Sequence, residues 1–124
     1  MPAADSYRRA SDLAPRQAQI LGGLGRSLLN METAEATAEA LEALREAARL
    51  DGADTGIWRD LALAEARSGN DGAAALATAE RFMIEGRPNE AIRNATRALD
   101  LIPRGAPGWR RADDLTTIAR RASR

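Results

Sequence analysis

The sequence has 124 residues, and its 18 acidic residues balance its 18 basic residues. All 18 basic residues are arginines, because the sequence contains no lysine. Histidine and cysteine are also absent, which excludes a zinc site of the His or Cys type, a thiol nucleophile, a Schiff base and an imidazole general base; we expect no catalysis and no cofactor in this chain. Zero net charge and few aromatic residues argue against nucleic acid as a partner, and no apolar run approaches the roughly 20 residues that cross a bilayer, so we expect no membrane insertion.

Helix-forming residues dominate the sequence from end to end. Alanine, leucine, arginine and glutamate are abundant, valine is absent, and no segment alternates as a strand does. Glycine and proline interrupt this composition at short intervals. The interruptions predict about seven helices, over residues 2–14, 17–30, 34–51, 55–68, 71–86, 88–101 and 107–122.

Two spacing patterns recur along the predicted helices. The first has steps of four, three and five and ends on a helix terminator: Ala3, Tyr7, Ala10 and Pro15; Ala40, Leu44, Ala47 and Gly52; Ala91, Ala95, Ala98 and Pro103. The second has steps of three, one and three: Leu21, Leu24, Gly25 and Leu28; in part Trp58, Leu61 and Ala62; and Ala75, Thr78, Ala79 and Phe82. No single helix has enough large apolar residues for a core, so we predict a stack in which each helix packs on its sequence neighbours.

Together the two patterns resemble the two helices of the tetratricopeptide repeat (TPR), a helix–turn–helix unit of about 34 residues. The resemblance implies an all-α fold in which antiparallel helix hairpins form a TPR-like α-solenoid over one domain, residues 1–124. The step from Ala3 to Ala40 is 37 residues, whereas the step from Trp58 to Ala75 is only 17. We therefore predict one irregular junction, at which the helix over residues 71–86 belongs to two successive pairs.

The same register divides the domain into four parts. Residues 1–15 match only the second helix of a repeat, residues 17–52 form a repeat, residues 55–103 form three helices with a shared middle helix, and residues 107–122 form a C-terminal capping helix. The partner of the first helix would precede residue 1. We therefore expect that the chain is cut from a longer protein or caps its stack in an unusual way.

A narrower resemblance covers residues 72–115. It is carried in order by residues 75–82, Gly86-Arg87, Ala98-Leu99, residues 103–109 and residues 111–114. This stretch resembles the C-terminal TPR region of bacterial BepA-like zinc metalloproteases. The resemblance implies a periplasmic protein with an N-terminal protease domain, a His-Glu-x-x-His zinc motif in that domain, and a role in outer-membrane protein assembly and quality control. No catalytic or zinc-binding position transfers to this chain, because it has no histidine.

The function that these resemblances imply is a non-catalytic protein–protein interaction module. Its partner would be a protein or peptide, or its own N-terminal protease domain, and any zinc would lie in that missing domain. One alternative is a structural domain that packs on the protease domain and gates it. Another is a stand-alone TPR scaffold or adaptor, for which a cytoplasmic location replaces the periplasmic one.

Six residues are candidates for partner binding: Arg26, Arg59, Met83, Ile84, Arg110 and Arg111. Phe82 to Ile84 are three consecutive apolar residues, which cannot all face the same side of a helix. The two C-terminal arginines belong to residues 104–124, where six arginines and two aspartates give a net charge of +4. Residues 31–51 have six acids and two arginines, a net charge of −4. Opposite ends of this kind permit head-to-tail contact between copies; the plainer interpretation of the basic segment is a solvated capping helix.

Several residues have structural interpretations. Gly25 lies inside a predicted helix and favours close helix packing over a phosphate loop. Asp54 precedes a predicted helix and is expected in its N-cap region. The i,i+3 spacing of Glu42 with Arg45, and of Glu46 with Arg49, predicts ion pairs on a solvated face. Two tryptophans, Trp58 and Trp109, begin apolar stripes and are expected to pack in the core.

Overall fold

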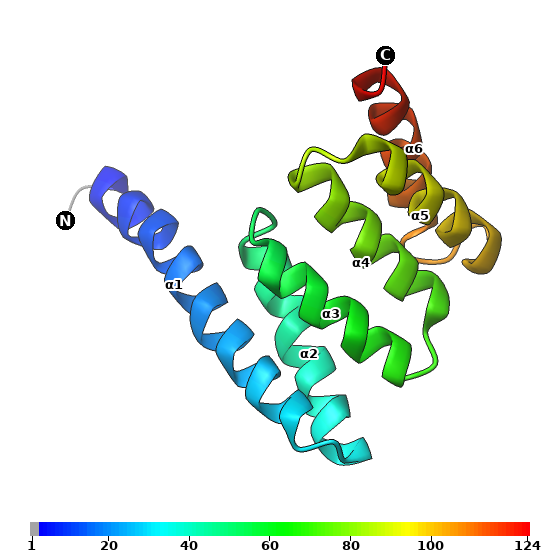
Figure 1. Ribbon diagram of the computed structural model, residues 1–124. Helices are drawn as coiled ribbons and strands as arrows, with labels where there is room; N and C mark the ends of the chain where they lie inside the picture. Colours follow the sequence, from blue (N-terminus) through cyan, green and yellow to red (C-terminus); the bar gives the residue numbers. More distant parts are fainter. Residues whose placement is uncertain (1–2) are drawn as a thin grey trace.

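The computed structural model describes the backbone of residues 3–124 and the side chains of residues 14–124. Within this part the secondary structure is helical, with no strand (Figure 1). The helices are α1 (Ala3–Asn30), α2 (Ala34–Leu50), α3 (Thr55–Arg67), α4 (Asp71–Ile84), α5 (Pro88–Leu101) and α6 (Trp109–Ala122). The predicted all-α fold, in which successive helices pack in pairs, is confirmed, with six helices over residues 3–124 in place of about seven.

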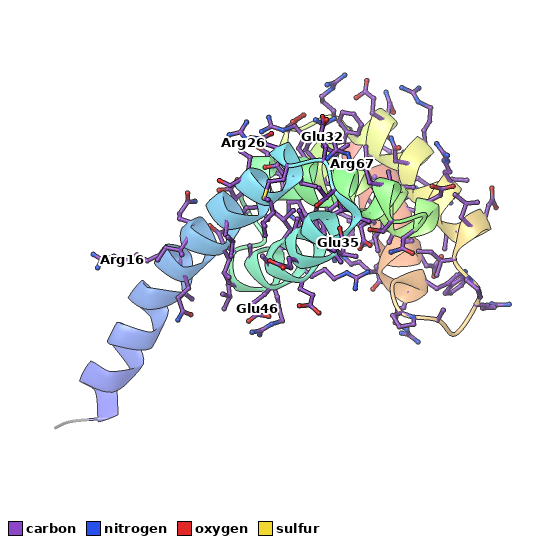
Figure 2. All side chains as sticks on the ribbon, turned by 90° about the horizontal axis from the view of Figure 1, so that it is seen from below. Arg16, Arg26, Glu32, Glu35, Glu46 and Arg67 are labelled. Carbon is purple, nitrogen blue, oxygen red and sulfur yellow. The ribbon has the colours of Figure 1, made fainter. Side chains whose placement is uncertain are left out.

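The difference lies at Pro15, where the sequence predicts a boundary and α1 continues without one. The prediction of a separate helix over residues 1–15 is therefore wrong for residues 3–15; residues 1 and 2 lie outside the described part. A proline inside a helix removes one backbone hydrogen bond, at a cost of about 3 kcal/mol. Here α1 has 28 residues and α2 only 17, and the first part of α1 projects beyond the other helices (Figure 2). Pro15 itself is exposed.

The helices form a stack in chain order, because each one packs against the next (Figure 1). Contacts between helices two apart change along this stack. In the described residues α1 contacts α3 and α4 contacts α6, whereas α2 does not contact α4 and α3 does not contact α5. Odd-numbered helices thus meet in the first half and even-numbered helices in the second. The change falls between α3 and α4, where the repeat step shortens to the 17 residues from Trp58 to Ala75.

Alanine makes most of the helix contacts. Fifteen of the twenty-one buried apolar residues among residues 14–124 are alanines, so the helix axes can approach closely. The first-pattern contact positions in α2 and α5 have no exposed surface, which confirms that they lie at helix interfaces: Ala40, Leu44, Ala47, Ala91, Ala95 and Ala98. The first copy of this pattern, Ala3, Tyr7 and Ala10, lies outside the described side chains. Trp58 and Trp109 are half-buried and pack against the edges of the core, as predicted.

The first hairpin is held together by a very close approach of α1 to α2 at Gly25. A Cβ atom at this buried position would lie 2.5 Å from the Cγ atom and 2.8 Å from the Cδ2 atom of Leu44. Leu44 is fully buried and cannot move into solvent. The predicted packing role of Gly25 is therefore confirmed, because the Leu44 side chain occupies the space that a side chain at position 25 would need.

Polar contacts attach α3 to this hairpin. Asp54 is the N-cap of α3, as predicted, and accepts a hydrogen bond of 3.1 Å from the backbone N–H of Ile57. At the other end, an Nη atom of Arg67 donates to the Leu29 carbonyl at 2.9 Å, in addition to the 3.2 Å hydrogen bond that this carbonyl accepts from the backbone N–H of Glu32. The Asp54 carboxylate also accepts a hydrogen bond of 2.9 Å from Gln19 of α1, so polar contacts join α3 to the first hairpin near both of its ends.

Candidate interaction surfaces

Two predicted site residues, Arg26 of α1 and Arg59 of α3, lie at one hollow of about 260 Å³. Both reach the same carboxylate: the Nε atom of Arg26 lies 4.0 Å and the Nε atom of Arg59 lies 3.7 Å from oxygens of Asp60. Three of the residues that line this hollow are glycines, which add no side chain to it. The full lining is Gln19, Gly22, Gly23, Arg26, Asp54, Gly56, Ile57, Arg59 and Asp60.

The charges in this α1–α3 hollow already balance one another. Two arginines face two aspartates, and Asp54 uses one oxygen for the helix cap and the other to accept a 2.9 Å hydrogen bond from Gln19. Side chains of Arg26 and Arg59 are more than half exposed, so their ion pairs contribute little to stability. The hollow is polar and shallow, and it lacks the uncompensated charge that would select a ligand.

The other four candidate residues lie elsewhere, so the six do not form one site. Met83 is half-buried and packs against a buried cluster of α4, α5 and α6, whereas its neighbour Ile84 is 42% exposed. On α6, Arg111 binds Glu80 of α4 through two hydrogen bonds of 2.7 and 3.0 Å. These hydrogen bonds raise the pKa of Arg111 and fix its side chain against α4. Arg110 is exposed.

A groove lies between α1 and α2, with apolar side chains on its α1 side. It consists of two adjoining hollows of about 420 and 360 Å³ that share Leu21 and Glu46. We call it the α1–α2 groove. The residues that line it are Gln17, Ile20, Leu21, Leu24 and Leu28 of α1 and Glu39, Glu42, Ala43, Glu46 and Leu50 of α2.

The α1 wall of this groove carries large apolar side chains that water reaches. Ile20 is 71% exposed and Leu24 is 49% exposed, and Met31, just beyond the end of α1, is 62% exposed. Ile20 and Leu24 are four residues apart, so they lie on the same side of α1 beside the groove, and Met31 lies outside its lining. Scattered exposed apolar residues are ordinary on protein surfaces, but neighbouring ones that line a groove are typical of an interaction site.

The α2 wall of the same groove is acidic. Glu35, Glu39, Glu42 and Glu46 are spaced four, three and four residues apart, which places them on one side of α2. Figure 2 shows Glu46 on one side of the hairpin and Arg26, at the α1–α3 hollow, on the other. The α1–α2 groove thus combines an apolar wall with an anionic one.

One predicted ion pair is wrong, and its correction explains why this wall stays acidic. Arg45 does not bind Glu42 but reaches α3, where it donates hydrogen bonds of 2.8 and 3.2 Å to the buried carboxylate of Glu65. A buried carboxylate needs such partners far more than an exposed one does. Among residues 14–124, no arginine forms an ion pair with Glu42.

The second predicted pair on α2 is confirmed. Arg49 binds Glu46 on the surface, and the hydrogen bond from Arg49 lowers the pKa of the Glu46 carboxyl. Glu46 therefore remains ionised to lower pH than an isolated glutamate. Within the described side chains, no group of three or more acidic residues converges as metal ligands.

Comparison with protein-family models, with curated proteins and with solved structures gives no match for this chain. The helices over residues 3–124 include none that has both the length and the apolar character needed to cross a bilayer. The class of the protein is accordingly defined by its fold: an all-helical, repeat-like stack. The α1–α2 groove was not predicted from the sequence, because Leu21, Leu24 and Leu28 were expected to pack inside the stack, although the four-residue spacing of Ile20 and Leu24 was a usable signal.

Proposed function

We propose that this chain is a non-catalytic, TPR-like α-solenoid that binds a protein partner in the α1–α2 groove. The observation that carries the proposal is the pair of exposed apolar side chains, Ile20 and Leu24, that line the groove opposite an acidic wall. Covering these side chains removes apolar surface from water, at about 25 cal/mol per Å². The acidic wall selects a partner surface that contains arginine or lysine.

Recognition of a helix explains the shape of this surface best. A groove between two helices accepts a third helix, which buries one apolar side chain per turn. The exposed side chains of the α1 wall recur at that spacing. A helical partner would therefore continue the stack, in the same way that each helix of this chain packs against the next.

The finer part of the proposal concerns the larger protein. We propose a place beside a bacterial periplasmic zinc metalloprotease that acts in outer-membrane protein quality control. Its support is the resemblance of residues 72–115 to the repeat region of BepA-like proteases. A His-Glu-x-x-His motif encoded in frame upstream of this segment is the expected observation, and an upstream sequence without it would remove the protease from the proposal.

A photo-crosslinking residue tests the binding proposal directly. We would place a benzophenone amino acid at Leu24, in the α1–α2 groove, and at Thr96, an exposed position of α5, as the matched control. In cells that produce the chain, irradiation should give protein adducts at position 24 that are absent at position 96. Mass spectrometry identifies the partner. Equal adducts at both positions, or none at position 24, would contradict the proposal.

A further inference from the structure

The two ends of the stack present surfaces of opposite charge. The α1–α2 groove lies at one end, since α1 contacts α2 and α3, and α6 lies at the other end, since it contacts α5 and α4 (Figure 1). The segment that contains α2, residues 31–51, has a net charge of −4, from six acids and two arginines. The segment that contains α6, residues 104–124, has a net charge of +4, from six arginines and two aspartates.

On α6 the positive charge forms a ridge on the side away from the core. Ala112, Leu115, Thr116 and Ala119 are the buried residues of this helix. At 100° per residue, the opposite side of the helix carries Arg110, Asp114, Thr117 and Arg121, all exposed; together with Arg124, which is exposed just beyond the end of α6, we call these residues the α6 ridge. Ile118, at the edge of the α6 ridge, is 44% exposed. Among the described side chains, none of the three arginines of the ridge forms an ion pair.

From these two surfaces we propose that the occupant of the α1–α2 groove is the α6 ridge of a second copy of this chain. This inference rests on the proposed function, because it names the partner of the same groove. Arg121 and Arg124 face the acidic wall formed by Glu39, Glu42 and Glu46. Their aliphatic stems, together with Ile118, cover the apolar wall of α1. The second copy thereby continues the helical stack across the interface.

The geometry makes this contact intermolecular and directional. The groove and the ridge lie at opposite ends of the stack, so one chain cannot satisfy its own groove with its own α6 (Figure 1). Contact between two different surfaces is heterologous, and it produces either a closed ring or an open chain of copies. A single helix in a groove buries less than the roughly 800 Å² per partner of a standard interface, so the association is weak and depends on concentration.

Salt is the first probe. Exposed charges are screened over about 10 Å at 0.1 M salt and over about 3 Å at 1 M. In sedimentation velocity at low salt, the average mass of the whole chain should therefore rise with concentration. The dissociation constant should increase about tenfold or more between low salt and 1 M salt, because several exposed ion pairs are weakened together.

Charge-swapped variants test the two surfaces separately. Glu39→Arg with Glu42→Arg makes the groove basic, and Arg121→Glu with Arg124→Glu makes the ridge acidic. Each double variant alone has like charges on both surfaces and should be monomeric. An equimolar mixture should associate again, because the unchanged ridge of the first variant fits the unchanged groove of the second.

A control separates this effect from net charge. Arg93→Glu with Arg97→Glu changes the same number of charges on exposed positions of α5, away from both surfaces, and should leave self-association unchanged. Circular dichroism checks that every variant retains its helix content. The inference is supported if association is restored in the mixture and the control variant self-associates as the wild type does.

Three results would overturn it: a wild-type chain that is monomeric at every concentration at low salt, self-association that neither swap reduces, or a mixture that stays monomeric. The crosslink at position 24 separates this failure from that of the proposed function. An adduct with a different protein, together with a monomeric wild type, keeps the binding proposal and excludes a second copy as the partner. No adduct and no self-association would exclude both.

Discussion

At the close approach of α1 and α2, we predict that Gly25→Ala raises or lowers the free energy of unfolding depending on one neighbouring residue, Leu44. A methyl group added by Gly25→Ala would lie 2.5, 2.8 and 3.1 Å from the Cγ, Cδ2 and Cδ1 atoms of Leu44. Overpacking of this kind costs about 1–3 kcal/mol. Alanine returns about 1 kcal/mol through its helix propensity. We therefore expect Gly25→Ala to lower the free energy of unfolding by about 1 kcal/mol.

Truncating Leu44 should reverse the effect of Gly25→Ala on stability. Leu44 has no exposed surface, so Leu44→Ala alone should cost about 2–5 kcal/mol and leave a cavity beside Gly25. In that background the methyl group of Gly25→Ala enters the vacated space. The helix propensity and the partly filled cavity then both favour it, and the substitution should stabilise the variant by about 1–2 kcal/mol.

Urea unfolding followed by circular dichroism at 222 nm measures all four corners of this cycle. Gly23→Ala is the matched control, because nothing lies within 4 Å of a Cβ atom at that position. It should stabilise the chain by about 1 kcal/mol in both backgrounds. If Gly25→Ala stabilised the wild type as the control does, Leu44 would be free to move and the close-packing argument would be refuted.

Three further predictions concern other contacts. Glu65→Ala should lower the free energy of unfolding by about 2 kcal/mol in urea unfolding, because a buried carboxylate loses its charged hydrogen bonds, and Glu65→Gln should cost less. Met83→Glu should destabilise by about 2 kcal/mol or more, whereas Ile84→Glu should stay within about 0.5 kcal/mol; equal effects on the thermal midpoint would contradict the burial of the first. The hydrogen bond from Arg49 lowers the pKa of Glu46 in the folded state. The contribution of this pair to stability is therefore complete at pH above the ordinary glutamate pKa, and it is lost as the pH falls through the lowered pKa of the folded state. Arg49→Gln should raise the midpoint of the Glu46 carboxyl in an NMR titration, and an unchanged midpoint would exclude this hydrogen bond in solution.

The helix boundaries between α3, α4 and α5 could be predicted from the sequence, because glycine residues at these positions end the helices locally. Glycine at Gly69 and Gly86 adopts positive φ angles of 80° and 72° and ends the helices before it, so the boundaries there fall within two residues of the prediction. Pro15 led to a wrong boundary because a proline weakens a helix but does not always end it, and α1 continues through this position. The length of α1 relative to α2 is a property of the tertiary structure, and the local sequence around Pro15 does not reveal it.

The surfaces were harder to predict, because exposure is set by neighbours that are distant in the sequence. The i,i+3 spacing gave Arg45 a partner on its own helix, but the buried Glu65 of α3, twenty residues away, binds it instead. Likewise, Leu21 and Leu24 share a helical stripe, yet one is half-buried and the other is 49% exposed. Periodicity identifies the face of a helix, whereas the packing of the stack decides which part of that face water reaches.

The alanine-rich core also has a thermal consequence. The heat capacity change of unfolding averages about 12–15 cal/mol/K per residue and increases with the apolar area that unfolding exposes. Alanine exposes less of this area than leucine or isoleucine, so we expect a value below that average for this chain. A small heat capacity change flattens the curve of stability against temperature. The stack should therefore keep a nearly constant, modest stability over a wide temperature range, with neither a pronounced optimum nor early cold denaturation.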